Sequence, residues 1–140
     1  MRAKSGSKDG LISELVELIY DADRQPPFPK KEVLSKIKTR EKMWGTLLPS
    51  GLAVPHARLK GYEDFIIAVA TPAEFVMHEG NPVRMMALMI TNQPGDPYYI
   101  PTLALLTKFS KDEAFFSRLC DAENREDFLH IVKERDSELV

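Results

Sequence analysis

The chain has 140 residues, with 19 Lys and Arg against 21 Asp and Glu, so its formal net charge is -2 at pH 7. This length is common for one domain, and a charge so near neutral offers no electrostatic footprint for nucleic acid or an anionic membrane. The longest purely apolar run, Met85–Ile90, is far shorter than the roughly 20 residues that span a bilayer. We therefore expect neither nucleic-acid binding nor direct membrane insertion.

The single cysteine, Cys120, excludes an internal disulfide and suits a reducing compartment. Residues 1–8 carry positive charge, but no apolar stretch behind them is long enough for a signal peptide. These features predict a cytoplasmic location, with proteins or small molecules as partners.

The N-terminal third is predicted to hold a leader and two helices. Residues 1–9 are polar and aperiodic, which indicates a flexible leader or linker and leaves residues 10–140 as the domain. Apolar residues then recur with the spacing of one helical face, at Ile12, Leu15, Val16 and Ile19. Prolines in residues 25–29 end this helix, and residues 30–38 resume helical spacing as a short second helix that ends near residues 39–40.

Strands are expected in the middle of the chain and helices after them. Residues 51–56 form a short apolar run with Pro55 near its end, as in a strand that delivers His56 to its carboxyl end. Residues 65–70 and 83–91 are near-continuous apolar runs, which favour strands covered on both faces. After residues 94–97 the pattern is helical, and Asp112 and Asn124 are candidate caps of two further helices. This order indicates an α/β sheet sandwiched by helices.

Among the three histidines, His56 is the candidate for chemistry. A side chain at the carboxyl end of a strand in an open α/β sheet lies where ligands usually gather. Arg58, two residues further on, could pair with a phosphoryl group through its planar fork, and Arg40 could approach from another side. We expect no role for His130, and for His78, in the turn expected at residues 77–82, a structural role is favoured over a site role. The residues alone leave an ordinary structural role for His56 open.

Other reaction classes find no support in the sequence. The histidines and Cys120 lack the spacing of metal ligands, so no metal site is expected. No Gly-x-Ser-x-Gly nucleophile motif occurs, and no glycine-rich pattern that cradles phosphates is present. We therefore expect no cofactor.

A longer signature surrounds His56. The segment Arg40-Glu41-Lys42, then Thr46, then Gly51-Leu52-Ala53-Val54-Pro55-His56-Ala57-Arg58 resembles the signature region of type-2 EIIA domains of the bacterial sugar phosphotransferase system, the fructose, mannitol and nitrogen-regulatory class. The resemblance extends from about residue 11 to about residue 134. It implies an EIIA-mannitol-like fold with a mixed central sheet sandwiched by helices.

The resemblance also implies a function and a site. His56 would accept a phosphoryl group from a histidine phosphocarrier protein and pass it to an EIIB-like protein or fused transporter domain, or hold it as a regulatory signal. Arg40, Arg58, Thr46 and Tyr99 would stabilise the phosphoryl group. Tyr99 aligns with the family's second histidine, and its hydroxyl can donate a hydrogen bond but cannot become a cation.

Two departures from the family pattern support an alternative. The family often has Thr-Gly-Ile-Gly before the signature strand, whereas this chain has Thr46-Leu47-Leu48-Pro49, so the loop must follow a different path. Together with Tyr99, this difference is compatible with a phosphorylation-degenerate regulatory module of a transporter or regulator. Such a module would bind a small anion, a nucleotide or a protein partner while retaining His56.

Overall fold

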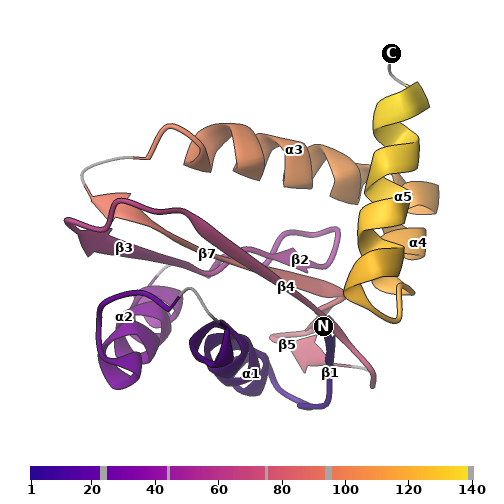
Figure 1. The fold of residues 1–140 in the computed structure, drawn as a ribbon. Helices are drawn as coiled ribbons and strands as arrows, with labels where there is room; N and C mark the ends of the chain where they lie inside the picture. The colour runs from indigo at the N-terminus through magenta and orange to yellow at the C-terminus, as the bar shows by residue number, and fades with distance from the viewer. Residues whose placement is uncertain (23–24, 44, 75, 94–95, 139–140) are drawn as a thin grey trace.

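The computed structural model describes residues 1–22, 25–43, 45–74, 76–93 and 96–138. Within them lie β1 (Arg2–Ala3), α1 (Lys8–Asp21), α2 (Lys30–Met43), β2 (Leu52–Ala53), β3 (His56–Lys60), β4 (Ile66–Pro72), β5 (Met77–His78), β6 (Asn81–Pro82), β7 (Met85–Gln93), α3 (Tyr99–Lys111), α4 (Glu113–Cys120) and α5 (Arg125–Glu138). Helices α1 and α2 lie on one side of the sheet and α3 on the other (Figure 1). The predicted α/β class, with a mixed sheet between helices, is confirmed.

The main sheet is organised around β7. Strand β4 pairs with it antiparallel on one side, and β2 and β3 pair with it parallel on the other. The short strand β1 extends the sheet beyond β4 in parallel pairing. Because β7 is central and covered on both faces, its near-continuous apolar sequence is the pattern expected of such a strand.

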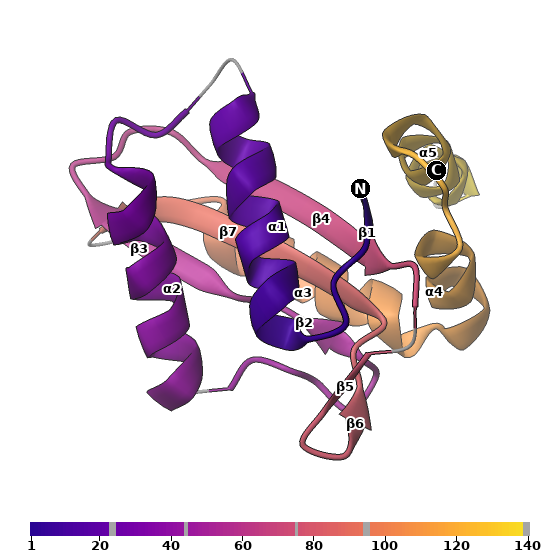
Figure 2. The same ribbon diagram turned by 90° about the horizontal axis from the view of Figure 1, so that it is seen from below.

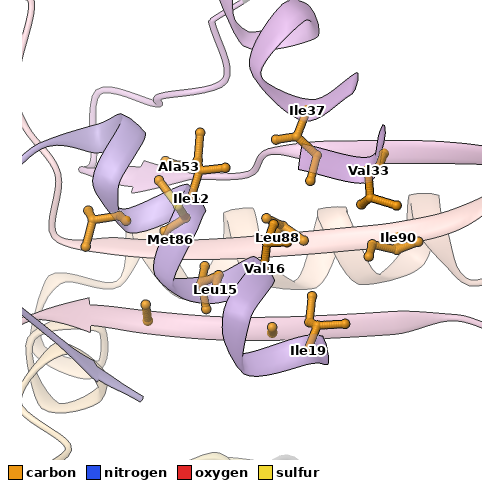
Figure 3. Close-up of a cluster of buried hydrophobic side chains, with 14 of the residues drawn as sticks. Ile12, Leu15, Val16, Ile19, Val33, Ile37, Ala53, Met86, Leu88 and Ile90 are labelled. Carbon is orange, nitrogen blue, oxygen red and sulfur yellow. The ribbon is translucent and has the colours of Figure 1, made fainter. Parts of the chain in front are cut away.

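Alternate side chains of β7 belong to two separate cores. Met86, Leu88 and Ile90 pack toward α1 and α2, whereas Met85, Ala87 and Met89 pack with the side chains of α3 and α4. Figure 3 shows the first core, in which α1 lays one apolar stripe against the sheet, formed by Ile12, Leu15, Val16 and Ile19. The helical face that the sequence predicted for α1 is therefore the face that is buried.

The beginning of the chain differs from the flexible leader predicted for residues 1–9. Arg2 and Ala3 form β1, which pairs with Thr71 and Pro72, and the side chain of Ala3 is fully buried. Ser7 then accepts a hydrogen bond from the backbone N–H of Gly10 and caps α1. A two-residue strand held mainly by backbone hydrogen bonds leaves no periodicity for sequence analysis to detect.

The segment around His56 also differs from the prediction of one strand ending at that residue. Leu52 and Ala53 form β2, the chain is interrupted at Val54 and Pro55, and His56 begins β3. Pro55 has no N–H to donate to a ladder, although its carbonyl accepts from Met89 N at 3.0 Å. His56 therefore lies beside the middle of β7 rather than at the carboxyl end of the sheet.

The helix boundaries are set by local capping and by packing. Asp112 accepts a hydrogen bond from Phe115 N and Asn124 from Asp127 N, which confirms both predicted caps. Helix α2 continues to Met43, a few residues beyond the predicted end near residues 39–40, and this extension places Arg40 within its last turn. Figure 2, the view from below, shows α1 and α2 side by side in front of the sheet.

Candidate functional site

His56 is held in the sheet with its ring almost completely covered. His56 is only 3% exposed. Its Nε2 lies 2.6 Å from the hydroxyl oxygen of Thr91, which is also buried. Thr91 lies two residues beyond Met89, the partner of His56 in the β3–β7 ladder, so both side chains project from the same face of the sheet. The other ring nitrogen, Nδ1, is buried without a hydrogen-bond partner among the described residues.

Tyr99, the first residue of α3, covers one face of this imidazole. The two ring centroids are 4.1 Å apart and the ring planes differ by 11°, a stacked arrangement. Stacking occupies the ring face, whereas a nitrogen lone pair lies in the ring plane, so Tyr99 packs on His56 without lying in the direction of a lone pair. The structure thus brings together the histidine and the tyrosine that the sequence singled out.

Burial and two arginines keep the imidazole neutral. The pKa of His56 is lowered from 6.5 to about 4; removal from water is the largest cause, and charge repulsion from Arg40 and Arg58 contributes as well. Arg40 comes from the last turn of α2, and Arg58 is two residues along β3. At neutral pH one nitrogen of the ring therefore carries a proton and the other a lone pair, the state in which histidine is a nucleophile.

A groove of about 660 Å³ runs between α2 and the edge strand β3 beside this histidine. Helix α2 contributes one side of the groove and β3 the other; the lining residues are Ser35, Lys36, Thr39, Arg40, Met43, His56, Ala57 and Arg58. Three of them are cations and none is acidic. The groove thus offers an electropositive opening next to a neutral imidazole.

Thr46 lies in a different polar cluster from the one expected. Its hydroxyl donates to a carboxylate oxygen of Glu41, and its backbone N–H lies 3.4 Å from the other oxygen. Glu41 in turn forms an ion pair with Lys8 at 2.6 Å, and the side chains of that pair are 5% and 4% exposed. Thr46 does not line the groove, so its role toward a phosphoryl group stays a prediction from the resemblance.

Thr91 is the contact of His56 that sequence reasoning missed. It follows the apolar run of β7, where a single threonine gives no chemical signal, and only the register of β3 against β7 brings it to the ring. His78 in β5 and His130 on α5 do not line the groove. Across the described ranges, no three His, Cys, Asp or Glu side chains gather where they could hold a metal ion.

The fold has close counterparts among solved structures. The nitrogen regulatory protein IIA-Ntr from Neisseria meningitidis has a TM-score of 0.80 at 22% identity, over 94% of this chain and 90% of that one. The complex of enzyme IIA mannitol with phosphorylated enzyme IIB mannitol from Escherichia coli has a TM-score of 0.72 at 17% identity, over 96% of this chain and 92% of that one. The architecture is therefore that of an EIIA domain.

Sequence comparison defines the family more closely. The profile of the family described as phosphoenolpyruvate-dependent sugar phosphotransferase system, EIIA 2, matches residues 1–135, and this chain belongs to that family. The nitrogen regulatory protein of Escherichia coli (strain K12) is 30% identical over 132 residues, which cover 90% of this chain and 76% of the relative. No helix in the described part of the chain combines the length and apolar character needed to cross a membrane.

Proposed function

We propose that this chain is a phosphohistidine carrier in which His56 accepts a phosphoryl group from a histidine phosphocarrier protein. The observation on which this proposal rests is a buried, neutral imidazole with arginines of two different elements beside it, at an electropositive groove. Membership of the EIIA 2 family supports the same conclusion.

The transfer needs only the chemistry that these groups supply. The lone pair of a His56 ring nitrogen attacks the phosphorus of the donor phosphohistidine, a new P–N bond forms, and the electron pair of the broken P–N bond stays on the donor ring. Arg40 and Arg58 stabilise the negative charge that spreads over the phosphoryl oxygens during this step. Their positive charges also keep His56 unprotonated, so the same two side chains favour both the nucleophile and the transition state.

From His56 the phosphoryl group would either be passed to an acceptor protein or be retained. An EIIB-like protein or a fused transporter domain is the proposed acceptor, in line with the solved complex of enzyme IIA mannitol and phosphorylated enzyme IIB mannitol. The name of the bacterial relatives, nitrogen regulatory protein, favours retention as a regulatory signal. We place this activity in the cytoplasm, where such carriers exchange phosphoryl groups.

Apolar side chains near the site support docking of a protein donor. Met43 at the end of α2 is 70% exposed, and Tyr98 and Ile100 flank Tyr99 at the start of α3 with 64% and 66% exposed. Exposed aromatic and methionine side chains are enriched in the centres of protein interfaces. A partner that covers them would also exclude water from the groove during transfer.

A regulatory module without phosphorylation is the second candidate. The observation that favours it is the burial of the His56 ring, which requires some opening of the site before a donor can reach a nitrogen. In that case the groove and the apolar side chains would serve binding alone.

Intact mass after incubation with phosphoenolpyruvate, enzyme I and the histidine phosphocarrier protein distinguishes the two. The carrier function requires an acid-labile phosphoryl adduct in the wild type and in His130→Ala, and its loss in His56→Ala. No adduct with a cognate donor set would contradict the carrier function and leave the regulatory module.

A further inference from the structure

The groove beside His56 is larger than phosphoryl transfer requires. A phosphoryl group is one phosphorus atom with three oxygens, whereas the groove has a volume of about 660 Å³. Ligand pockets in proteins commonly measure about 300–1,000 Å³, so this volume suits a whole metabolite. Most of the groove would remain empty when His56 alone carried a phosphoryl group.

The polar side chains of the groove extend well away from the histidine. Helix α2 contributes Ser35, Lys36, Thr39, Arg40 and Met43, positions that recur on one helical face. From the first to the last of them the helix rises by about 12 Å, at roughly 1.5 Å per residue. Lys36 lies one turn before Arg40 on this face and is therefore a cation that a phosphoryl group on His56 does not need.

The charge of the groove indicates what it would bind. Lys36, Arg40 and Arg58 are basic, His56 is neutral, and none of the described lining residues is acidic. The hydroxyls of Ser35 and Thr39 can donate to anionic oxygens between these cations. The net charge of the chain is -2, so the protein as a whole does not attract anions. A basic lining of this kind favours the binding of an anion at the groove itself.

We propose that the α2–β3 groove binds a small polyanion, an organic phosphate or a polycarboxylate, that spans from Lys36 to Arg40 and Arg58. A bound polyanion occupies the two arginines and the approach to His56, so it competes with phosphoryl loading. The binding stands independently of phosphorylation, whereas the competition rests on the proposed carrier function. The groove would thereby make phosphoryl loading responsive to the level of a metabolite.

Calorimetric titration with pyrophosphate and with citrate tests the binding, and the two probes separate phosphate from carboxylate chemistry. We expect saturable binding of at least one probe, and Lys36→Met to weaken it by at least about threefold, the effect of one partly solvated charge. Lys38→Met is the matched control, because Lys38 is on α2 but does not line the groove. The titration uses unphosphorylated protein throughout, so this readout does not require phosphorylation.

Binding that fails to saturate by about 10 mM would overturn the proposal, since affinity weaker than millimolar amounts to no more than a few kcal/mol. An equal loss in Lys36→Met and Lys38→Met would overturn it as well, because it would show attraction to general positive charge. The competition is tested by adding the bound probe to the phosphorylation assay, where the adduct should form more slowly. Unchanged loading at a saturating probe concentration would refute the competition.

Discussion

Two polar clusters include residues of the last turns of α2, and they differ in the groups that their cations lie beside. In the first, Lys8 and Glu41 form a buried ion pair, and Thr46 donates to the same carboxylate. In the second, Arg40 and Arg58 face a neutral imidazole whose Nδ1 has no partner among the described residues. The first cluster pairs a cation with a carboxylate, whereas the second places two cations near a neutral ring.

This difference is the one expected between a structural cluster and the proposed phosphoryl site. Arg40 and Glu41 are consecutive residues, so the ion pair that holds Glu41 to α1 also fixes the helix turn that presents Arg40. Buried polar groups are normally satisfied, and an unsatisfied one calls for a specific explanation. The proposed carrier function supplies such an explanation, because a phosphoryl group would become the partner of a ring nitrogen.

The largest effect should follow from breaking the Lys8–Glu41 ion pair. Glu41→Ala leaves Lys8 buried without its counter-charge, and we expect it to lower the free energy of unfolding by about 3–5 kcal/mol. Denaturant unfolding measures the change. Glu17→Ala, which removes the exposed partner of Lys30, is the control and should have a much smaller effect because water and salt screen that pair. Equal losses of unfolding free energy in the two variants would show that the buried Lys8–Glu41 pair contributes no more to stability than an exposed pair.

In the cluster around His56, removal of one cation should impair phosphoryl transfer rather than folding. Arg40→Met should slow phosphoryl loading by about 100-fold, the usual cost of removing one group that stabilises transition-state charge. The rate is measured by quenched-flow intact mass. Lys42→Met is the matched control, because Lys42 is exposed on the same helix and does not line the groove. A normal rate in Arg40→Met would remove this arginine from the mechanism.

A smaller effect is expected at Thr91. Thr91→Val keeps the shape of the side chain but leaves Nε2 of His56 without its hydrogen bond, and we expect loading to slow by about tenfold. Thr91→Ser restores the hydroxyl and should recover most of the rate. If valine and serine behave alike, the contact between Thr91 and His56 does not position the ring.

The smallest effect concerns protonation of His56. Burial is the first cause of its low pKa, so Arg40→Met should raise the value of about 4 only part of the way toward 6.5. NMR titration of the ring measures this shift. A pKa near 6.5 in the wild type would contradict the neutral, charge-repelled imidazole.

The same pKa predicts how stability depends on pH. Between pH 6.5 and pH 4 the unfolded chain binds the His56 proton and the folded chain does not, so the free energy of unfolding should fall as pH is lowered through this window. His56→Gln cannot titrate and should flatten that part of the curve, as measured by denaturant unfolding at each pH. A variant curve parallel to the wild-type curve would assign the dependence to other groups.

Patterns that depend on neighbouring residues were predictable from the sequence. The apolar face of α1 and the two-sided burial of β7 follow from periodicity, and Asp112 and Asn124 cap the helices as expected. The string from Gly51 to Arg58 also directed attention to His56, although the site-residue assignments themselves stay predictions.

Features set by pairing between distant segments were not predictable. The Thr91 contact depends on the β3–β7 register, and the strand at Arg2 depends on the free edge of β4. A proline near the end of an apolar run indicates the end of a strand. The carbonyl of Pro55 nevertheless accepts a hydrogen bond from Met89 N, and the chain resumes pairing with β7 at His56. Thr46 is the residue that the family signature has at this position, yet its hydroxyl donates a hydrogen bond to Glu41. No local sequence pattern reveals that Glu41 is buried.

The most direct test of the account is to locate the phosphoryl group on the chain. The protein is prepared with ¹⁵N-labelled histidine, loaded through the donor proteins and examined for coupling between ³¹P and ring nitrogen. The account predicts one coupled nitrogen, assigned to His56 by its disappearance in His56→Ala. A phosphoryl group on His78 or His130, or on no histidine at all, would contradict it.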